Sequence, residues 1–417
     1  MNGLTTARAR TLRAGTVVFL AGMLCCAVAS GSAHAAPAPT TGAAQAERNV
    51  VITDLSCPSA DRCMTVGNDA SGTRTRAYAR LWNGSAWTDT RPRQGGRGNA
   101  SYLFAVACPS RRVCVAVGDY ETSADPLGRP YAQIFRAGKW KVTPVPEPPN
   151  DSFSSLSAVG CASARMCVAV GNALAGEHNQ TYSVIWNGRK WRIKRPDLPA
   201  ATTYSRLASV SCSGPRACTA SGQYQTHDSS KSRTLIETWS GRAWTRQRTP
   251  NPRSGPNGSV LDGVSCWARR GCMAVGHANK LANDGSLTLA ARLAGQRWTR
   301  SESLDLAAPA TSVLLDVECP SRRSCVAVGV SFSQAPTPTT SPLMQAFDGT
   351  SWRIDQTPVP AGAFATSPVA VSCAAPGACM AVGNYNPSDP YLRMASPPSI
   401  PVALSYDGTA WTLAAAP

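Results

Sequence analysis

The sequence predicts an all-β fold made of seven similar sheets, and two observations support this prediction. A pair of cysteines spaced C-x5-C returns seven times in the 417-residue chain, every 51 to 54 residues. About 25 residues after the first cysteine of a pair comes a phrase such as WNGRKW, WSGRAW, FDGTSW or YDGTAW. A repeat of this length with four short strands is typical of one blade of a β-propeller, and seven blades lie within the usual range for a closed one.

Each repeat divides into four predicted antiparallel strands. The first ends at the first cysteine, and the second runs from the second cysteine through A-V-G. The third ends before an N-G or D-G pair in many repeats, and the fourth opens at tryptophan. These segments are short and rich in β-branched residues, and N-G or D-G between apolar runs is a strong hairpin signal. The expected blades are residues 50–100, 101–154, 155–205, 206–259, 260–312, 313–366 and 367–417.

Residues 1–35 have the features of a secretory signal peptide. Three arginines precede an apolar stretch over residues 17–28, and the small-residue site A-H-A ends at Ala35, where we expect cleavage. A retained membrane anchor is the alternative, but the apolar stretch is short for a bilayer span. We expect a disordered leader over residues 36–49, which are rich in Pro, Ala and Thr. We therefore expect the protein to be secreted. The arginine-rich composition indicates a high-GC Gram-positive bacterium as its source.

The cysteines support export to an oxidising compartment. Two of the 16 cysteines lie in the signal peptide, and the other fourteen form the seven pairs. Cysteines six apart around a five-residue turn would face each other across a hairpin, whereas two cysteines without neighbouring histidines make a poor zinc site. We expect no metal and no cofactor. The predicted disulfides are Cys57–Cys63, Cys108–Cys114, Cys161–Cys167, Cys212–Cys218, Cys266–Cys272, Cys319–Cys325 and Cys373–Cys379.

The repeat resembles two known propeller families. The V-G that ends the second strand and the tryptophan that opens the fourth resemble the kelch repeat, and D-G-x-x-W resembles the Asp-box hairpin of sialidase-like propellers. A kelch strand ends in Gly-Gly, whereas a single glycine is present here. An Asp box places its aspartate two residues before the glycine, whereas Asp348 and Asp407 directly precede theirs. The resemblance implies a propeller fold and leaves the activity open.

The connections between the second and third strands are long and different in every repeat. They emerge on one face of a propeller, where binding specificity on a repetitive scaffold usually resides. Polar residues at the end of the second strand would lie near the mouth of the central channel, although such residues are also common turn formers. The candidate ligand contacts are Asn68, Asp119, Tyr120, Asn172, Gln223, Tyr224, His277, Asn384 and Tyr385.

The tryptophans that open the fourth strands obey the sevenfold repeat, so we expect them to pack between blades rather than to bind a ligand. Trp267 differs, because it lies within a turn where other repeats have Pro, Ala or Ser. It is either available to a partner or covers its own hairpin.

The turns between paired cysteines are rich in arginine, within a chain of formal charge +17. On a propeller these side chains would lie together on the face opposite the long loops, where they could bind a polyanion. The alternative is that arginine only keeps tight turns soluble. The arginines are Arg62, Arg111, Arg112, Arg165, Arg216, Arg269, Arg270, Arg322 and Arg323.

The sequence favours a binding module over an enzyme. It has neither a G-x-S-x-G nor an H-E-x-x-H motif, and few histidines. Glu318 is a weak candidate for a catalytic acid, because it replaces a small residue beside a cysteine on an inner strand; Asp54 and Asp316 are similar exceptions. We therefore expect a secreted, non-enzymatic interaction module for an anionic cell-wall or extracellular polymer, a glycan or a protein. The alternative is a carbohydrate-active hydrolase, sialidase-like or another glycosidase, with its site on the long-loop face.

Overall fold

The computed structural model describes residues 49–95, 100–122, 125–149, 151–176, 178–252, 257–280, 285–306, 311–333, 339–387 and 398–417. These residues form 28 β-strands. The predicted signal peptide and all but the last residue of the predicted leader lie outside the described residues. Within the described ranges, no helix is long and apolar enough to cross a membrane.

The strands group in chain order into seven sets of four, which we call blades 1 to 7. Blade 1 holds β1 (Val50–Ser59), β2 (Arg62–Asp69), β3 (Arg76–Trp82) and β4 (Trp87–Asp89). Blade 2 holds β5 (Ser101–Ser110), β6 (Val113–Thr122), β7 (Asp125–Arg136) and β8 (Lys139–Val142). Blade 3 holds β9 (Asp151–Ser163), β10 (Met166–Ala175), β11 (His178–Trp186) and β12 (Trp191–Ile193). Blade 4 holds β13 (Thr202–Gly214), β14 (Ala217–Thr226), β15 (Ser229–Trp239) and β16 (Trp244–Gln247).

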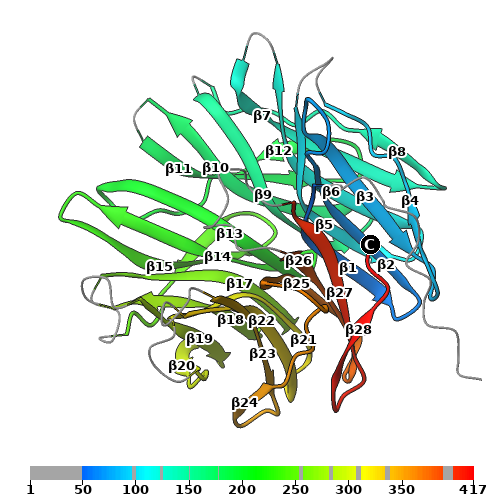
Figure 1. Cartoon of the computed structure of the whole chain (residues 1–417). Coiled ribbons are helices and arrows are strands. Elements are labelled where there is room, and N and C mark those ends of the chain that lie inside the picture. Colours follow the sequence, from blue (N-terminus) through cyan, green and yellow to red (C-terminus); the bar gives the residue numbers. More distant parts are fainter. Residues whose placement is uncertain are drawn as a thin grey trace, which may run out of the picture. The chain divides into compact units, whose positions relative to one another are not determined.

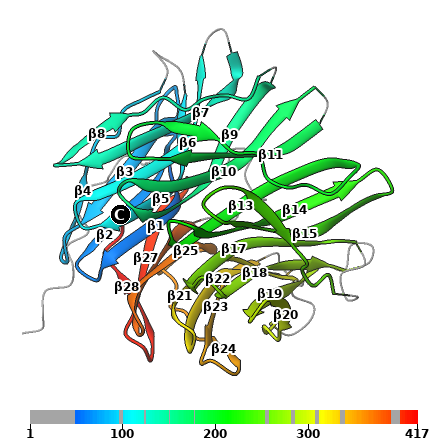
Figure 2. The same ribbon diagram turned by 180° about the vertical axis from the view of Figure 1, so that it is seen from behind.

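Blade 5 holds β17 (Ser259–Ala268), β18 (Gly271–Asn279), β19 (Ser286–Ala294) and β20 (Arg297–Ser301). Blade 6 holds β21 (Thr311–Ser321), β22 (Ser324–Ser333), β23 (Thr339–Phe347) and β24 (Trp352–Asp355). Blade 7 holds β25 (Ala365–Ala375), β26 (Ala378–Asn386), β27 (Ile400–Tyr406) and β28 (Trp411–Ala414). Figures 1 and 2 show the blades following one another in the order of the colours.

Each blade is an antiparallel sheet in which consecutive strands are neighbours. Single parallel bridges, Asn179 to Tyr204 and Thr340 to Ala365, join blade 3 to blade 4 and blade 6 to blade 7. The first strand of every blade packs against the first strand of the next, and β1 packs against β25. Figure 1 shows blue β1 beside the orange and red strands of blade 7. The predicted all-β, seven-bladed propeller is confirmed.

Every C-x5-C pair forms a disulfide within its own blade, which confirms one disulfide per blade. The cysteines lie opposite each other on the first and second strands, with Cα atoms 3.9 to 4.0 Å apart. In blade 4, for example, Cys212 is the direct cross-strand partner of Cys218. The disulfide thus fixes the two innermost strands of a blade at their turn.

The turn between the third and fourth strands has its own local support. The side-chain Oδ1 of Asp348 accepts hydrogen bonds from the backbone N–H groups of Thr350 (2.8 Å) and Ser351 (2.8 Å). The pKa of Asp348 is lowered, mainly because these N–H groups and the Thr350 hydroxyl stabilise the carboxylate. Asn83 caps its turn in the same way. The glycine that follows adopts a positive φ, 104° at Gly349, which explains the N-G and D-G pairs.

Aromatic pairs at the ends of the third and fourth strands fill the space between blades. In six blades the rings are 4.9 to 5.6 Å apart, as in Phe347 with Trp352 and Tyr406 with Trp411. Several tryptophans of this kind also donate a hydrogen bond from Nε1 to the preceding blade, such as Trp140 to the hydroxyl of Thr90. They are structural, as their sevenfold repetition predicts. Blade 5 departs from the pattern, because Leu293 takes the place of the first ring.

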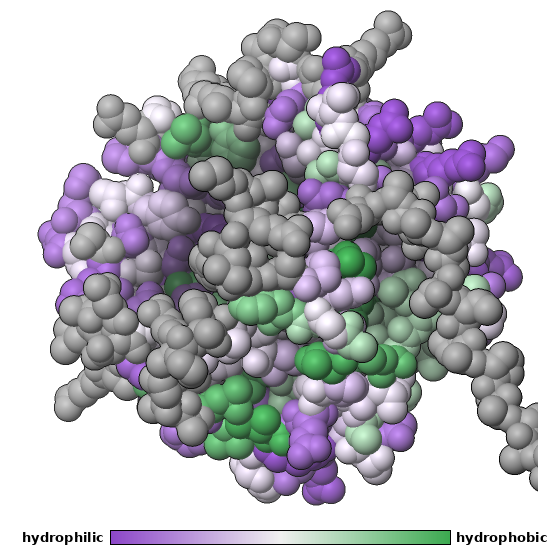
Figure 3. Space-filling view, in the orientation of Figure 1, coloured by the Kyte–Doolittle hydropathy of each residue, from purple (hydrophilic) through white to green (hydrophobic). Residues whose placement is uncertain are grey.

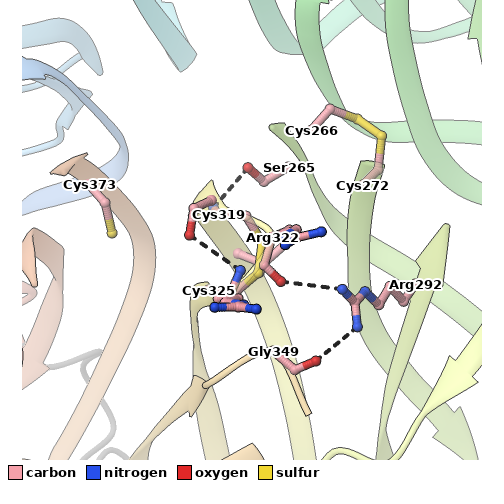
Figure 4. Close-up of a disulfide and its surroundings, with 12 residues drawn as sticks. Ser265, Cys266, Cys272, Arg292, Cys319, Arg322, Cys325, Gly349 and Cys373 are labelled. Carbon is pink, nitrogen blue, oxygen red and sulfur yellow. Dashed lines mark hydrogen bonds between the residues drawn. A yellow bond between two sulfur atoms is a disulfide. The ribbon is translucent and has the colours of Figure 1, made fainter. Parts of the chain in front are cut away.

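Repeated hydrogen bonds close the circle of blades. The serine before the first cysteine accepts a bond from the backbone N–H of the next blade's first cysteine, as Ser265 does from Cys319 (2.9 Å; Figure 4). Ser372 of blade 7 accepts the same bond from Cys57 of blade 1 (2.9 Å). Because blade 7 is built wholly from consecutive strands, the ring closes by non-covalent contacts of this repeated type.

Candidate functional site

The hairpin turns between strands one and two and those between strands three and four lie side by side; we call this surface the turn face. In several blades, the residue two positions before the second cysteine packs against a glycine of the same blade. This glycine lies in the turn between the third and fourth strands. A Cβ placed on Gly188 would lie 3.2 Å from the Cβ of Arg165, and one on Gly349 would lie 3.0 Å from Cγ of Arg323. The aliphatic stems of these arginines therefore lie flat on the turn, and their guanidinium groups remain at the surface.

The turn face presents the nine predicted arginines together. Eight of them are exposed, and Arg62 is half-buried. Arg111 forms a bidentate ion pair with Asp61 of the preceding blade, with N–O distances of 2.5 and 2.7 Å. The pair lowers the pKa of Asp61. Among the described residues, Arg111 is the one arginine of this set with such a pair. The surface is therefore strongly cationic.

Trp267 lies over its own hairpin. Its ring occupies the space above Gly271, where an added Cβ would lie 2.3 Å from Nε1 of the indole. The guanidinium of Arg292 lies 5.9 Å from the Trp267 ring and 5.3 Å from the Phe347 ring. Figure 4 shows this guanidinium donating to the backbone oxygens of Gly349 (3.0 Å) and Arg322 (3.3 Å). Trp267 thus helps to join blades 5 and 6.

The first strands of all seven blades line a central cavity of about 440 Å³. Most of its lining is small, because the positions one and three before each first cysteine are usually Ala, Ser or Gly. Asp54, Asp316 and Glu318 are the exceptions that sequence analysis singled out, and all three line this cavity. The structure therefore brings together acids that are about 260 residues apart in the chain.

The walls of the cavity remove these carboxyls from bulk water, although part of each side chain faces the hollow. Burial raises the pKa of Asp54 to about 8, with added repulsion from Asp316 and Glu318. Burial likewise raises the pKa of Glu318 to about 8 and that of Asp316 to about 6. Burial and mutual repulsion thus favour the protonated form of these carboxyls, and a carboxyl with a raised pKa in a cavity can act as an acid.

Two of the three carboxyls also accept hydrogen bonds from the backbone of a neighbouring blade. Oδ2 of Asp54 accepts a hydrogen bond from the backbone N–H of Val106 in blade 2 (2.7 Å). Oδ2 of Asp316 accepts the same bond from Val371 in blade 7 (2.9 Å). Glu318 contacts the hydroxyl of Ser265 in blade 5. No cluster of three or more His, Cys, Asp or Glu side chains in the described ranges is placed to hold a metal ion.

Several candidate ligand contacts at the ends of the second strands bind neighbouring blades, and Asn68 and Asn384 are half-buried there. Asn68 Oδ1 accepts a bond from the backbone N–H of Leu103 (3.0 Å). Asn384 exchanges two bonds with the backbone of Ile52, at 2.9 and 3.0 Å. Asp119 is buried, which raises its pKa to about 6, although a bond with the Ser155 hydroxyl opposes the shift.

The other candidates at this level are spread over several blades. Nδ1 of His277 lies 3.0 Å from Oδ2 of Asp262. The ring of Tyr120 packs edge-on against that of Tyr131, with centroids 5.8 Å apart. The remaining four are in the second strands of blades 3, 4 and 7: Asn172, Gln223, Tyr224 and Tyr385. Of these four, Tyr224 lines a hollow of about 550 Å³ together with Asp228 and Arg233. Residues 281–284, 334–338 and 388–397 of the long loops lie outside the described residues.

A cavity that sequence analysis did not identify lies between blades 4 and 5, although three arginines around it belong to the predicted polyanion-binding set. A cavity of about 290 Å³ opens there and is lined by Arg216, Arg269 and Arg270 together with Leu293. The signal in the sequence was Leu293, which replaces the aromatic residue found five before the tryptophan in the other repeats.

The fold and these sites define the chain as a seven-bladed β-propeller. No protein-family model matches it, and no curated protein matches it by sequence. Among solved structures, an ulvan lyase is similar with a TM-score of 0.51 and 11% identity, over 84% of this chain and 91% of the lyase.

Two further solved structures are similar at lower TM-scores. YCF48 from Cyanidioschyzon merolae gives 0.47 at 10% identity, over 86% of this chain and 96% of YCF48. Sqt1 from Chaetomium thermophilum gives 0.48 at 12% identity, over 88% and 84%. An ulvan lyase has also been determined bound to -[GlcA(1-4)Rha3S]-, and Sqt1 bound to the N-terminus of the ribosomal protein L10. At these identities the likeness shows the fold alone.

Proposed function

We propose that this chain is an exported, non-enzymatic binding module that holds an anionic polymer outside the cell through its turn face. The observation that carries the proposal is the display of nine arginines on turns fixed by disulfides, with one of them ion-paired among the described residues. Guanidinium groups bind carboxylate, sulfate and phosphate through paired N–H donors. Several such groups on one surface suit a ligand with repeated negative charge.

The rigidity of the turns favours binding. Each arginine lies on or beside a hairpin that a disulfide closes. Binding of a polymer therefore costs less conformational entropy than it would if the arginines lay on a flexible loop. Figure 3 adds that hydrophilic residues predominate along the margin of the face drawn there, while hydrophobic residues occur in small groups. A polar, charged ligand fits this molecule better than an apolar one.

Export is supported by the seven disulfides, which indicate an extracellular location, since such bonds persist in oxidising compartments. The predicted signal peptide would direct the chain there. An anionic cell-wall or extracellular polymer is therefore within reach of the turn face.

The test is retention of the mature protein on heparin, used as a sulfated polymer, over a range of salt concentrations. Replacing Arg111, Arg112, Arg322 and Arg323 with Ser removes four charges from the turns of blades 2 and 6. We expect the slope of log affinity against log salt to flatten by about 3.

A matched control replaces Arg74, Arg76, Lys231 and Arg233 with Ser. All four are exposed: Arg74 precedes β3, and the other three lie in the first half of β3 or β15, near the ends opposite the turn face. The net charge therefore falls equally in the two variants. The control should keep most of the retention. Equal loss in both variants, or no loss in either, would show that the turn face is no binding site.

The central cavity favours a second candidate function, a carbohydrate-active hydrolase with Glu318 as its acid. The supporting observation is the raised pKa of Glu318 in a cavity shared with Asp54 and Asp316. Inverting and retaining glycosidases both need such a pair of carboxyls. Incubation with a glycan panel and measurement of reducing ends would decide. Sugar released by the wild type and not by Glu318→Gln would replace the binding module with this enzyme.

A further inference from the structure

Blade 5 breaks the sevenfold pattern at one point between the blades. In six blades two aromatic rings pack together at the end of the third and fourth strands. In blade 5, Leu293 pairs with Trp298 in the register, so a smaller side chain stands where a ring is expected. The cavity of about 290 Å³ lies at this place, lined by Leu293 and by Trp239 of blade 4. This local exception distinguishes the boundary between blades 4 and 5 from the other boundaries of the propeller.

The cavity continues into a second hollow of about 560 Å³, since both are lined by Gln247 and Gln296. We call the two together the blade 4–5 groove. Its arginines come from both blades: Arg216, Arg246, Arg248, Arg269, Arg270 and Arg297. No carboxylate is among the residues that line either hollow. The charged residues that line these two hollows are therefore all cationic, and an adjoining hollow that shares Arg246 and Arg248 is also lined by the acid Asp228.

The groove also offers neutral hydrogen-bonding groups. Thr238, Ser240 and the two glutamines line it beside the arginines. The amide nitrogen of Gln247 is fixed by bonds to the Thr238 hydroxyl (3.0 Å) and the Thr245 carbonyl (3.2 Å). These groups match the hydroxyls of a sugar better than a bare inorganic anion.

We propose that the blade 4–5 groove binds one segment of an acidic polysaccharide, with uronate or sulfate groups on the arginines and sugar hydroxyls on the amides and hydroxyls. This inference rests on the proposed binding function and names its ligand class and its specific site. A single-stranded nucleic acid fits less well, because base stacking needs exposed aromatic faces. Trp239 and Trp298 are only 4% and 7% exposed.

The test uses a defined heparin hexasaccharide and isothermal titration calorimetry on the mature protein. Leu293→Trp restores the aromatic pair and fills the cavity without a change of charge. We expect hexasaccharide binding about tenfold weaker than in the wild type. Phe347→Trp, a similar enlargement at the same position of blade 6, is the matched control and should leave binding unchanged.

A second variant guards against a folding defect in Leu293→Trp. Gln296→Glu changes an exposed side chain of the same groove and adds a negative charge, so it should also weaken hexasaccharide binding about tenfold. If both variants bind the hexasaccharide as the wild type does, the groove is not the site. The proposed function still stands in that case if the blade 2 and blade 6 arginine variant loses polymer retention.

An oligodeoxythymidylate of similar charge tests the ligand class. We expect it to bind much more weakly than the hexasaccharide and to be unaffected by Leu293→Trp. Equal affinity of the two probes, lost in the same variants, would overturn the assignment to an acidic polysaccharide.

Discussion

Glu237 lies fully buried in β15, at a position where blades 2 and 6 have glutamine. Gln345 accepts a bond from the backbone N–H of Leu304 (3.0 Å) and donates one to its carbonyl (2.7 Å). Gln133 forms the same two bonds with Arg93. At Glu237 the neighbouring donor is the backbone N–H of Asp197, but neither carboxyl oxygen meets it with full hydrogen-bond geometry. Burial raises its pKa to about 8, against smaller opposing effects of the Asp197 amide and Arg246. A protonated carboxyl has one donor and one acceptor, as the amide has, so neutral Glu237 can replace glutamine here.

Glu237→Gln should stabilise the protein at neutral pH. Between its ordinary pKa of 4.5 and about 8, the folded state keeps a proton that the unfolded state has lost. The free energy of unfolding therefore falls as pH rises through this window. Glu237→Gln has no ionisable group at this position and so avoids this pH-dependent loss. We expect its free energy of unfolding to exceed that of the wild type by on the order of 2 kcal/mol at pH 8 and to equal it at pH 4. Urea unfolding at several pH values measures the difference.

The reciprocal variant, Gln345→Glu, is the control for this prediction. It should lose stability at pH 8 and regain it as the pH falls, because it places an ionisable group in the equivalent site of blade 6. Identical pH profiles for the wild type and both variants would contradict a buried, protonated carboxyl at Glu237.

At the scale of the elements, every blade contains the same rigid hairpin, formed by its first two strands and closed by a disulfide. Each bond closes a ring with a sequence separation of 6, so the loss of chain entropy that it imposes on the unfolded state is small. Replacing Cys161 and Cys167 of blade 3 with Ser should lower the free energy of unfolding by about 2 kcal/mol. Urea unfolding of the oxidised proteins measures this loss.

A second pair of serines, at Cys373 and Cys379 in blade 7, tests whether the bonds act locally. Losses in the free energy of unfolding at distant sites should be additive. The variant that lacks both disulfides should therefore lose about the sum of the two separate losses. A much greater loss would mean that one hairpin supports another blade's fold.

At the scale of the whole molecule, the contact of blade 7 with blade 1 decides whether the circle stays closed. Asn384 makes two hydrogen bonds with Ile52 across this boundary, 332 residues apart in sequence. Asn384→Ala leaves the backbone groups of Ile52 without these partners and should cost about 1 to 3 kcal/mol. Hydrogen exchange should accelerate first in β1 and β26.

Asn68→Ala is the comparison for that prediction, because Asn68 makes the same kind of contact from blade 1 to blade 2, which are also joined by the chain. We expect faster exchange near β5 only, with blade 7 unaffected. Opening of the blade 7 boundary in both variants would show that Asn384 has no special part in closing the circle.

The sequence by itself determined the repeat, the number of blades, the four strands in each and the disulfide pairing. All of these follow from local signals, such as a hairpin pair, a turn glycine or two cysteines six residues apart. It also placed the nine arginines on one set of turns, since the direction of antiparallel strands fixes the face on which a turn emerges. Leu293 was visible as an exception in the repeat, although its consequence was not.

Only the tertiary structure decided which of the residues that depart from the sevenfold repeat lie close together. Asp54, Asp316 and Glu318 share one cavity, and Asn68 and Asn384 form hydrogen bonds with the backbone of neighbouring blades. Leu293 of blade 5 and Trp239 of blade 4 line the same cavity. The physical reason is that packing between blades depends on side-chain volume and hydrogen-bond partners from two sheets, and a repeat read along one chain describes each sheet alone.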